Sequence, residues 1–427
     1  MVAVPVILVL LFGLLAIGVI VPFALAASGM VALEIYKSLP LERIVSAAVW
    51  DTVTTPELLA LSLFILMAEI LLASDAARLL FRGLAPFSRR LPGGLLHVNV
   101  IGCAIFAAVC GSSAATAATI GKISVPQLKA LGYSSRWSVG SLAGSATLGL
   151  LIPPSIILII YGVLMQTSII SLFLAGIVPG LLLALAFSTV LAVFARRQPD
   201  GAAAAGGAAE EGLWKPLLRT IPILLLALAV IVALYGGYAS PTEAALVGVL
   251  GAILVALLLT RRIATLAEGF FAAVRPIAML GLILVGAKIL TAAFAYLGIS
   301  REVAAYIGGS GFSKTEFLLL ILVLFVALGC VMDGLSLLVM TLPLLAPALV
   351  TLNIDPVWFG IFAVILIEIG QITPPVGMNL FVIRGMTGEP ISAIAAGAWP
   401  FMACLLALVA AIMTVPEIVL FLPGALK

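Results

Sequence analysis

Charged residues are scarce in this chain of 427 residues: only 9% of the positions are Asp, Glu, Lys or Arg, and there is one histidine. A soluble domain carries roughly 25% charged residues, so this chain could not cover its own surface in water. The sequence also lacks a GxxxxGK[ST] loop, an HExxH motif and a GxSxG motif. ATP-driven transport and hydrolysis therefore lack their usual machinery, and we predict that the protein is not an enzyme.

Cysteine is almost as rare, and its spacing predicts no metal centre. The four cysteines, Cys103, Cys110, Cys330 and Cys404, show no ligand-like pattern, and we interpret them as small packing residues. No transition metal and no organic cofactor are expected. The net charge of +3 is small and its basic residues lie in short loops, so nucleic acid is not an expected partner.

Apolar residues take the place of charge. They make up 64% of the chain, and the mean hydropathy is +1.35. Apolar runs of about twenty residues, separated by short polar turns, predict an all-α polytopic protein embedded in a lipid bilayer, with room for ten or so spans. The apolar run 1–36 is too long for a signal peptide and is expected to be retained. A break at Gly18 and Pro22 favours two short helices there, with one kinked helix as the alternative.

The first half of the chain, 1–195, reads as one structural repeat. An amphipathic helix at 39–50 should lie at the membrane interface, and a span at 57–80 carries Glu69, which is either functional or part of a satisfied interhelical contact. Next come a basic loop with Arg78, Arg82, Arg89 and Arg90, a hairpin at about 93–130, a broken span at about 136–165 and a span at 168–195. The hairpin arms, 95–110 and 116–130, are each too short to cross alone, so we predict a re-entrant hairpin with Gly-Ser-Ser at its tip.

The second half, 214–427, repeats this plan after a Gly/Ala-rich flexible linker at 196–213. We predict spans at 216–235 and 241–260, an interfacial stretch at 261–275, a span at 276–297 and a polar turn at 301–314. A second re-entrant hairpin at about 315–350, a broken span at about 356–386 and a closing segment at 390–422 follow.

The distribution of Lys and Arg orients this plan. With the N-terminus outside, nearly all basic residues fall on the cytoplasmic side, and only Lys37, Arg43, Arg301, Lys314 and Lys427 fall on the other, with Lys288 inside a span. The first hairpin then enters from the cytoplasm and the second from the far side. The halves are therefore predicted to be inverted repeats, which suits alternating access around one central site.

Each half contains a Pro-Pro pair preceded, four residues earlier, by a glycine: Gly149 before Pro153-Pro154 and Gly370 before Pro374-Pro375. Proline interrupts a helix and frees backbone carbonyls, which is costly in hydrocarbon unless another group satisfies them. Because Na⁺ is a hard cation suited to oxygen ligands, two copies predict two Na⁺ sites. The first would use Cys110, Ser112, Gly149, Ile152 and Pro153, and the second Gly329, Gly370, Thr373 and Val376.

Polar side chains near these breaks are candidates for contacts with an anionic substrate: Ser112, Ser113, Thr116, Gln371 and Asn379. The alternative is that the small hydroxyl residues only join helices. Asp333, near the second tip, could orient the tip, coordinate indirectly or cap the helix that begins at 334; we favour the cap. The single histidine, His97, is interpreted as an interfacial residue rather than a proton relay.

At these residues the chain resembles the large membrane subunit of the tripartite ATP-independent periplasmic (TRAP) transporters. The matching stretches are HVNV (97–100), GSSAATAATIG (111–121), LGLLIPPSIILIIYG (148–162), SPTEAALVG (240–248), GCVMDG (329–334) and DPVWFGIFAVILIEIGQITPPVGMNLFVIRGM (355–386). They occur in both halves, so the resemblance covers essentially the whole chain.

The resemblance implies a Na⁺-driven, elevator-type secondary transporter of the bacterial inner membrane, with a moving transport domain (about 78–195 and 300–390) and a scaffold. It implies three partners: a separate small four-helix membrane subunit, a periplasmic substrate-binding protein, and a small organic acid such as a C4-dicarboxylate, keto acid or sugar acid. The family's backbone ion ligands correspond here to Cys110, Gly149, Ile152, Pro153, Gly329, Gly370, Thr373 and Val376. Ala107 and Cys110 stand where some members have serines.

Two other functions fit the same sequence. A Na⁺/dicarboxylate symporter of the same superfold would work without a binding protein, and a channel would conduct without coupling. The sequence does not identify the substrate.

Overall fold

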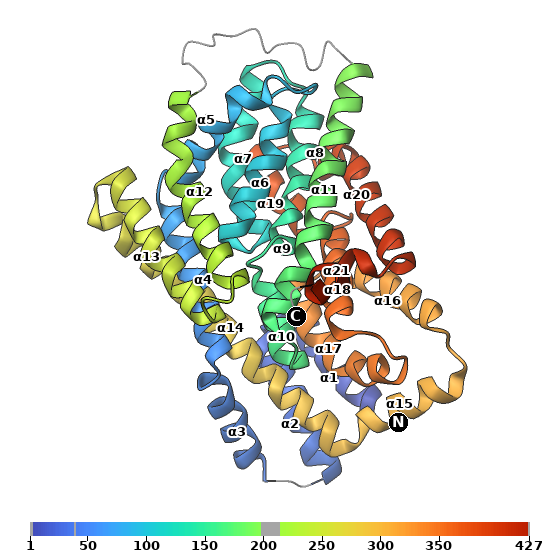
Figure 1. Ribbon diagram of the computed structural model, residues 1–427. Helices are drawn as coiled ribbons and strands as arrows, with labels where there is room; N and C mark the ends of the chain where they lie inside the picture. Colours follow the sequence, from blue (N-terminus) through green and yellow to red (C-terminus); the bar gives the residue numbers. More distant parts are fainter. Residues whose placement is uncertain (1–2, 38–39, 198–213, 426–427) are drawn as a thin grey trace.

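The computed structural model describes residues 3–37, 40–197 and 214–425, and every regular element in these ranges is a helix (Figure 1). In the first half the helices are α1 (Ala3–Ala16), α2 (Val21–Lys37), α3 (Leu41–Val53), α4 (Pro56–Ala73), α5 (Ala76–Ser88), α6 (Leu96–Cys110), α7 (Ser113–Ala130), α8 (Ser135–Ala146), α9 (Leu148–Leu151), α10 (Ile156–Met165) and α11 (Ile169–Arg197).

The second half continues the all-helical pattern. Its helices are α12 (Trp214–Tyr235), α13 (Pro241–Thr260), α14 (Ile263–Leu297), α15 (Ile299–Ser310), α16 (Lys314–Gly329), α17 (Gly334–Thr351), α18 (Pro356–Gln371), α19 (Met378–Thr387), α20 (Ile391–Thr414) and α21 (Glu417–Ala425). The linker predicted at 196–213 lies, from residue 198 on, outside the described residues.

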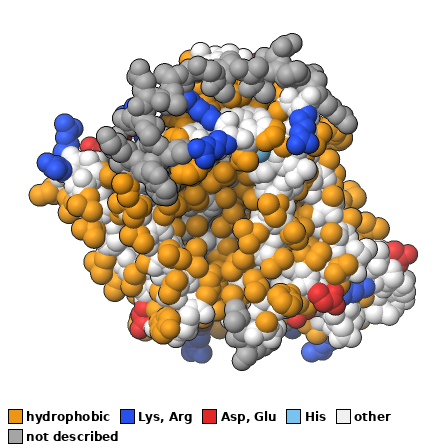
Figure 2. Space-filling view, turned by 45° about the horizontal axis from the view of Figure 1, so that its top comes forward, with side chains coloured by type: hydrophobic (Ala, Val, Ile, Leu, Met, Phe, Trp, Pro, Cys, Tyr) orange, Lys and Arg blue, Asp and Glu red, His pale blue; other side chains and the backbone are white. Residues whose placement is uncertain are grey.

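Seven of the described helical segments, with α8 to α10 taken as one, are long and apolar enough to cross a membrane. Figure 2 shows hydrophobic side chains covering the flank of the molecule, with Lys and Arg side chains towards its upper and lower ends. A surface of this kind is stable in lipid and not in water. The prediction of an all-α polytopic membrane protein is confirmed.

Local sequence signals start several of these helices. The Ser240 and Ser313 hydroxyls accept hydrogen bonds from the backbone N–H groups of Glu243 and Glu316, whose side chains in turn accept from the serine N–H groups. These capping boxes satisfy the exposed donors at the beginnings of α13 and α16. At the N-terminus Gly18, with φ of +86°, separates α1 from α2, so the prediction of two helices is confirmed there, although Pro22 lies inside α2.

Two predictions about basic and polar segments were wrong. Arg78 and Arg82 do not lie in a loop but on the exposed face of α5, whose other face buries Leu80, Phe81 and Leu84. This burial stabilises α5 as an amphipathic helix. The prediction was wrong because it considered only the number of arginines and not the apolar residues between them. The turn predicted at 301–314 is largely helix α15, which begins directly after Gly298.

Two predicted boundaries were also wrong. The stretches 261–275 and 276–297 form one 35-residue helix, α14, with Pro276 inside it. One proline removes one backbone donor, and here the surrounding helix compensates for that loss. The closing segment 390–422 is two helices, α20 and α21, separated at Val415.

The two predicted hairpin ranges contain the helix pairs α6–α7 and α16–α17. Figure 1 places α6 and α7 in the upper half of the molecule and α16 and α17 in the lower half. Gly111 and Ser112 join the first pair, and residues 330–333 join the second. That the hairpins are re-entrant and the halves inverted repeats stays a prediction.

Glycines let helix backbones touch in two separate groups. A Cβ at Gly140 of α8 would lie 2.3 Å from the backbone carbon of Gly397 in α20. A Cβ at Gly286 of α14 would lie 2.5 Å from the Pro22 carbonyl oxygen in α2, and one at Gly269 would lie 2.7 Å from the Cα of Ile70 in α4. Close backbone approach is how helices associate in lipid, so α8 packs on α20, while α14 packs on α2 and α4.

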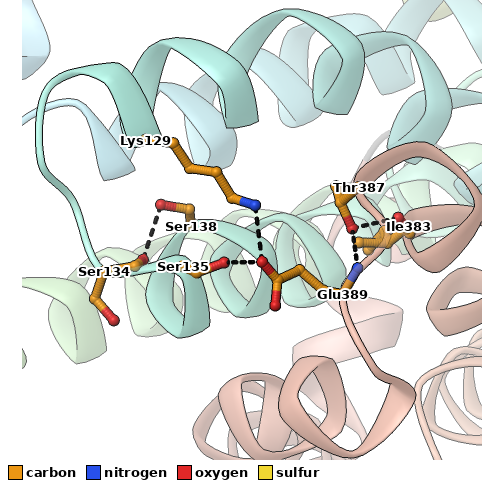
Figure 3. Close-up of polar contacts among 7 residues, drawn as sticks. All are labelled: Lys129, Ser134, Ser135, Ser138, Ile383, Thr387 and Glu389. Carbon is orange, nitrogen blue, oxygen red and sulfur yellow. Dashed lines mark hydrogen bonds and ion pairs between the residues drawn. The ribbon is translucent and has the colours of Figure 1, made fainter.

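A polar cluster ties the two halves of the chain together (Figure 3). Lys129 Nζ, at the end of α7, donates to Glu389 Oε1 over 2.8 Å, and Ser135 Oγ, at the start of α8, donates to the same oxygen over 2.6 Å. The hydrogen bonds from Lys129 and Ser135 hold the pKa of the Glu389 carboxyl below its ordinary value. The cluster therefore joins the first hairpin to the loop between α19 and α20.

We expect Gly140→Ala to lower the thermal unfolding temperature of the purified protein. The added methyl group meets backbone atoms of Gly397, and overpacking of this kind costs about 1–3 kcal/mol. Gly281→Ala in α14 is the matched control, since no atom lies within 4 Å of its Cβ position. Equal unfolding temperatures for the two variants would contradict the close α8–α20 contact.

We expect Glu389→Gln to destabilise the protein at pH 7 by less than about 1 kcal/mol, because the cluster is partly exposed to solvent. The folded-state pKa of Glu389 is depressed, so its contribution is present above the unfolded-state pKa and is lost as the pH falls through the folded-state pKa. Melting curves of wild type and variant should therefore converge in acid. A difference in unfolding temperature between wild type and Glu389→Gln that does not change with pH would show that the carboxylate charge is not its cause.

Candidate functional site

The first Pro-Pro pair interrupts the helical path between α9 and α10. Gly149 and Leu150 stand four residues before Pro153 and Pro154, so their carbonyl groups have no backbone N–H to accept from at the usual helical distance. The chain is extended at Ile152, and helix α10 resumes after Ser155, whose hydroxyl caps the N–H of Leu158. The Pro153-Pro154 peptide bond is cis.

The tip of the first hairpin lies directly against this break. A Cβ at Gly149 would stand 2.8 Å from the Cα of Ser113, and a Cβ at Gly111 would stand 2.8 Å from the carbonyl oxygen of Pro154. Gly111 has a φ of +60°, a conformation that favours glycine. Its carbonyl oxygen accepts a hydrogen bond from the N–H of Ile156 over 3.4 Å.

The second Pro-Pro pair ends α18 in the same way. Gly370 and Gln371 stand four residues before Pro374 and Pro375, whose peptide bond is also cis. A Cβ at Gly370 would lie 2.7 Å from the Cα of Gly329 at the second hairpin tip. The N–H of Gly377 donates to the Cys330 carbonyl oxygen over 2.9 Å. Each hairpin tip thus contacts the broken helix of its own half, backbone to backbone.

The residues predicted for Na⁺ fit a hard cation at the first break. Cys110 ends α6, where the last carbonyls of a helix lack internal partners, and Ile152 and Pro153 follow the end of α9. Their backbone oxygens, with those of Ser112 and Gly149, are the type of ligand that such cations prefer. Coordination by these residues stays a prediction.

At the second break some of the predicted oxygens already have partners. The Gly370 carbonyl accepts from the Thr373 N–H over 3.1 Å, and the Thr373 hydroxyl donates to the Ile369 carbonyl over 2.5 Å. The Gly370 carbonyl oxygen and the Thr373 hydroxyl oxygen each keep a lone pair that could bind a cation. Gly329 and Val376 supply backbone carbonyls on either side of the contact between the hairpin tip and α18.

Two of the predicted substrate residues are brought together, and most of the set is enclosed. Ser113 and Asn379 are 1% and 0% exposed, and Asn379 Nδ2 donates to Ser113 Oγ over 2.7 Å. Thr116 and Gln371 are also buried. Ser112 is half-buried and its hydroxyl caps α7, so it is the predicted substrate contact that lies nearest the surface.

Asp333 and Glu69 occupy the surroundings of the tips. Asp333 Oδ2 accepts from the N–H of Ser336 over 3.0 Å, which confirms the predicted cap of α17. Glu69 of α4 is half-buried and lies within electrostatic range of Cys110. Glu69 therefore lies near the end of the first hairpin arm, on a helix outside the hairpin.

Sequence reasoning missed Glu368. This residue of α18 is 1% exposed, and the Ser113 hydroxyl lies 3.0 Å from its Oε2 atom. An ionisable residue inside an apolar run, VILIEIG, was the signal that could have found it. Glu368 joins the second broken helix to the first hairpin, so the two tips belong to one region.

Two cavities lie where the end of α10 meets neighbouring helices. One, of about 600 Å³, lies between α10, α3 and α14, and the other, of about 710 Å³, between α10, α4 and α13. Val163, Gln166 and Lys288 line both. None of the predicted substrate residues lines either cavity.

Several transporters are similar to this chain in sequence, and one solved transporter is similar to it in fold. The chain is 31% identical over 390 residues, 90% of both chains, to the C4-dicarboxylate TRAP transporter large permease protein DctM of Pseudomonas aeruginosa. It is 30% identical over 404 residues to the sialic acid TRAP transporter permease protein SiaT of Haemophilus influenzae, covering 93% of this chain and 65% of the relative. The YdaH transporter of Alcanivorax borkumensis has a similar solved fold, with a TM-score of 0.64, 16% identity and 88% of both chains covered.

The family model matches nearly the whole chain. Residues 8–418 match the family described as tripartite ATP-independent periplasmic transporter, DctM component. This range contains both hairpins, both Pro-Pro breaks and Glu368. The chain therefore belongs to the DctM component family of the TRAP transporters, as its motifs predicted.

Proposed function

We propose that this protein is the translocating membrane subunit of a Na⁺-coupled importer of a small organic acid. The observation that carries the proposal is the backbone contact between each hairpin tip and the broken helix of its own half, at Gly149 and at Gly370. Carbonyl groups that lose their helical partners in a membrane must be satisfied by another group. Na⁺ at each contact would satisfy them, and its gradient would drive uptake.

An elevator motion is the mechanism that fits this arrangement best. The hairpins, the broken helices and α20 would move together, because α8 packs closely on α20 and α7 packs on α19. Helices α2, α4, α13 and α14 would form the scaffold. Glycine-mediated contacts within each group favour rigid bodies over bending.

The polar groups of the site and the names of the relatives support an organic acid as the substrate. The Ser112 hydroxyl and the Gln371 amide can hydrogen-bond a carboxylate. The relatives carry the names of C4-dicarboxylate and sialic acid transporters, and both substrates are organic acids. A periplasmic binding protein would deliver the acid, and a small membrane subunit would stand beside the scaffold in the inner membrane, with the N-terminus on the periplasmic side.

Reconstitution into liposomes tests the proposal. With the small subunit and an acid-loaded binding protein, we expect uptake that requires an inward Na⁺ gradient and stops when choline replaces Na⁺. Uptake without a binding protein would instead indicate a self-sufficient symporter. Accumulation that only follows the solute gradient and ignores Na⁺ would indicate a channel.

A methyl group at the first tip contact should interfere with the cation. In Gly149→Ala the new Cβ meets the Ser113 backbone at 2.8 Å, and the separation it forces costs about 1–3 kcal/mol. We expect the Na⁺ concentration for half-maximal uptake to rise about tenfold, since 1.4 kcal/mol corresponds to one decade. Gly281→Ala is again the control, and an unchanged Na⁺ dependence in Gly149→Ala would argue against a cation at this contact.

A further inference from the structure

Three polar groups from different parts of the fold converge on the hydroxyl of Ser113. The Ala146 carbonyl oxygen lies 2.9 Å away, Glu368 Oε2 3.0 Å and Asn379 Nδ2 2.7 Å. They come from the end of α8, from α18 and from α19, while Ser113 begins α7. The three side chains are 0–1% exposed, so water does not complete their hydrogen bonds.

The polar groups around the Ser113 hydroxyl include more hydrogen-bond acceptors than the available protons can serve. A serine hydroxyl has one proton, yet Ser113 faces two acceptors, the Ala146 carbonyl and Glu368 Oε2. The backbone N–H of Leu150 faces the Glu368 carboxyl group, but two further acceptors, Glu368 Oε1 and Asn379 Oδ1, are buried without a hydrogen bond of normal geometry. Both unpartnered oxygens belong to groups that contact Ser113, so both lie close to its hydroxyl. Buried oxygens in this number are costly unless a hydrogen-bond donor or a cation serves them.

No described side chain supplies that charge. The described charged residues on α7 and on the helices that contact α18 lie elsewhere, mostly near helix ends: Lys122 and Lys129, Arg196, Lys314, Glu316, Asp333, Arg384 and Glu417. Among the described residues no ion pair includes Glu368; its one side-chain hydrogen bond is to Ser113. A buried carboxylate without a positively charged partner costs several kcal/mol.

We propose that Ser113, Glu368, Asn379 and the Ala146 carbonyl form an additional site for a monovalent hard cation, Na⁺, apart from the two sites at the Pro-Pro breaks. The inference rests on the proposed function and names a further ion for it. The ligands are mainly side-chain oxygens and include a full negative charge, whereas the two tip sites use backbone oxygens. The described residues hold no cluster of three or more His, Cys, Asp or Glu, so the chemistry is that of an alkali cation and not of a transition metal.

The thiol and hydroxyl next to the site do not belong to it. The Thr116 hydroxyl, one turn further along α7, interacts with the sulfur of Cys110. The backbone N–H of Leu150 faces the Glu368 carboxyl group and provides the neighbouring neutral contact. A cation in this site would hold the start of α7 to α18 and α19, and so would join the first half of the chain to the second.

Equilibrium binding of radioactive Na⁺ to the purified full chain tests the site. We expect Glu368→Gln to bind one Na⁺ fewer than wild type per chain, and its thermal unfolding temperature to rise less when NaCl replaces choline chloride. Glu417→Gln, at an exposed position on α21, removes the same charge and should match wild type. Glu368→Asp keeps the charge on a shorter side chain and should bind as many Na⁺ ions as wild type, at least tenfold more weakly.

The outcomes separate this inference from the proposed function. If Glu368→Gln binds as many Na⁺ ions as wild type with unchanged affinity, Glu368 is no ligand and the additional site does not exist. A neutral, proton-bearing Glu368 would give that same result. If wild type itself binds no Na⁺, the proposed function fails as well. If Glu368→Gln does not fold, wild-type affinity in Glu368→Asp would overturn the site, because a ligand moved by one methylene must weaken binding.

Discussion

A backbone carbonyl in the hydrocarbon of a membrane must have a partner, and this constraint organises the centre of the protein. In a continuous helix each carbonyl is served by the N–H four residues ahead. Proline at 153, 154, 374 and 375 removes that donor for Gly149, Leu150, Gly370 and Gln371. The breaks are stable only if something polar is brought to them, and in both halves a hairpin tip is brought there. The glycines at 149 and 370 permit the contact because a Cβ at either position would collide with the tip backbone.

The rest of the architecture holds these contacts in place. Helix α8 precedes the first break and packs on α20 at Gly140 and Gly397, where there is no room for a methyl group. The Glu389 cluster ties the end of α7 and the start of α8 to the loop after α19, and Ser113 ties the start of α7 to α18 and α19. Helix α7 is thus anchored to the other half at both ends. A unit fastened in this way can move as one body, as an elevator mechanism requires.

The sequence predicted those features that are encoded locally. Pro-Pro pairs, glycines and short apolar arms mark a break or a tip wherever they stand, so the breaks at 153 and 374 and the helix pairs around Gly111 and residues 330–333 were found at nearly their observed positions. Charge alone did not predict α5 correctly. The arginines Arg78 and Arg82 suggested a loop, whereas the helix is stabilised by the burial of Leu80 and Phe81, and that burial depends on packing against α6, α7 and α12. Likewise, whether Pro276 ends a helix depends on what packs around it. Glu368 was missed because its partner, Ser113, lies 255 residues away.

Glu368 could also connect the two tip contacts, at Gly149 and at Gly370, so that they act together. The contacts at Gly149 and Gly370 each lie within one half of the chain, so cations there could bind independently. A polar junction formed by Ser113 from the first half and by Glu368 and Asn379 from the second changes this. Any shift of the first tip alters the surroundings of a carboxyl group located two residues before Gly370. In a chain with so few charges, a carboxylate at this position would couple the two breaks, because the energy of a buried charge depends steeply on the placement of its partners.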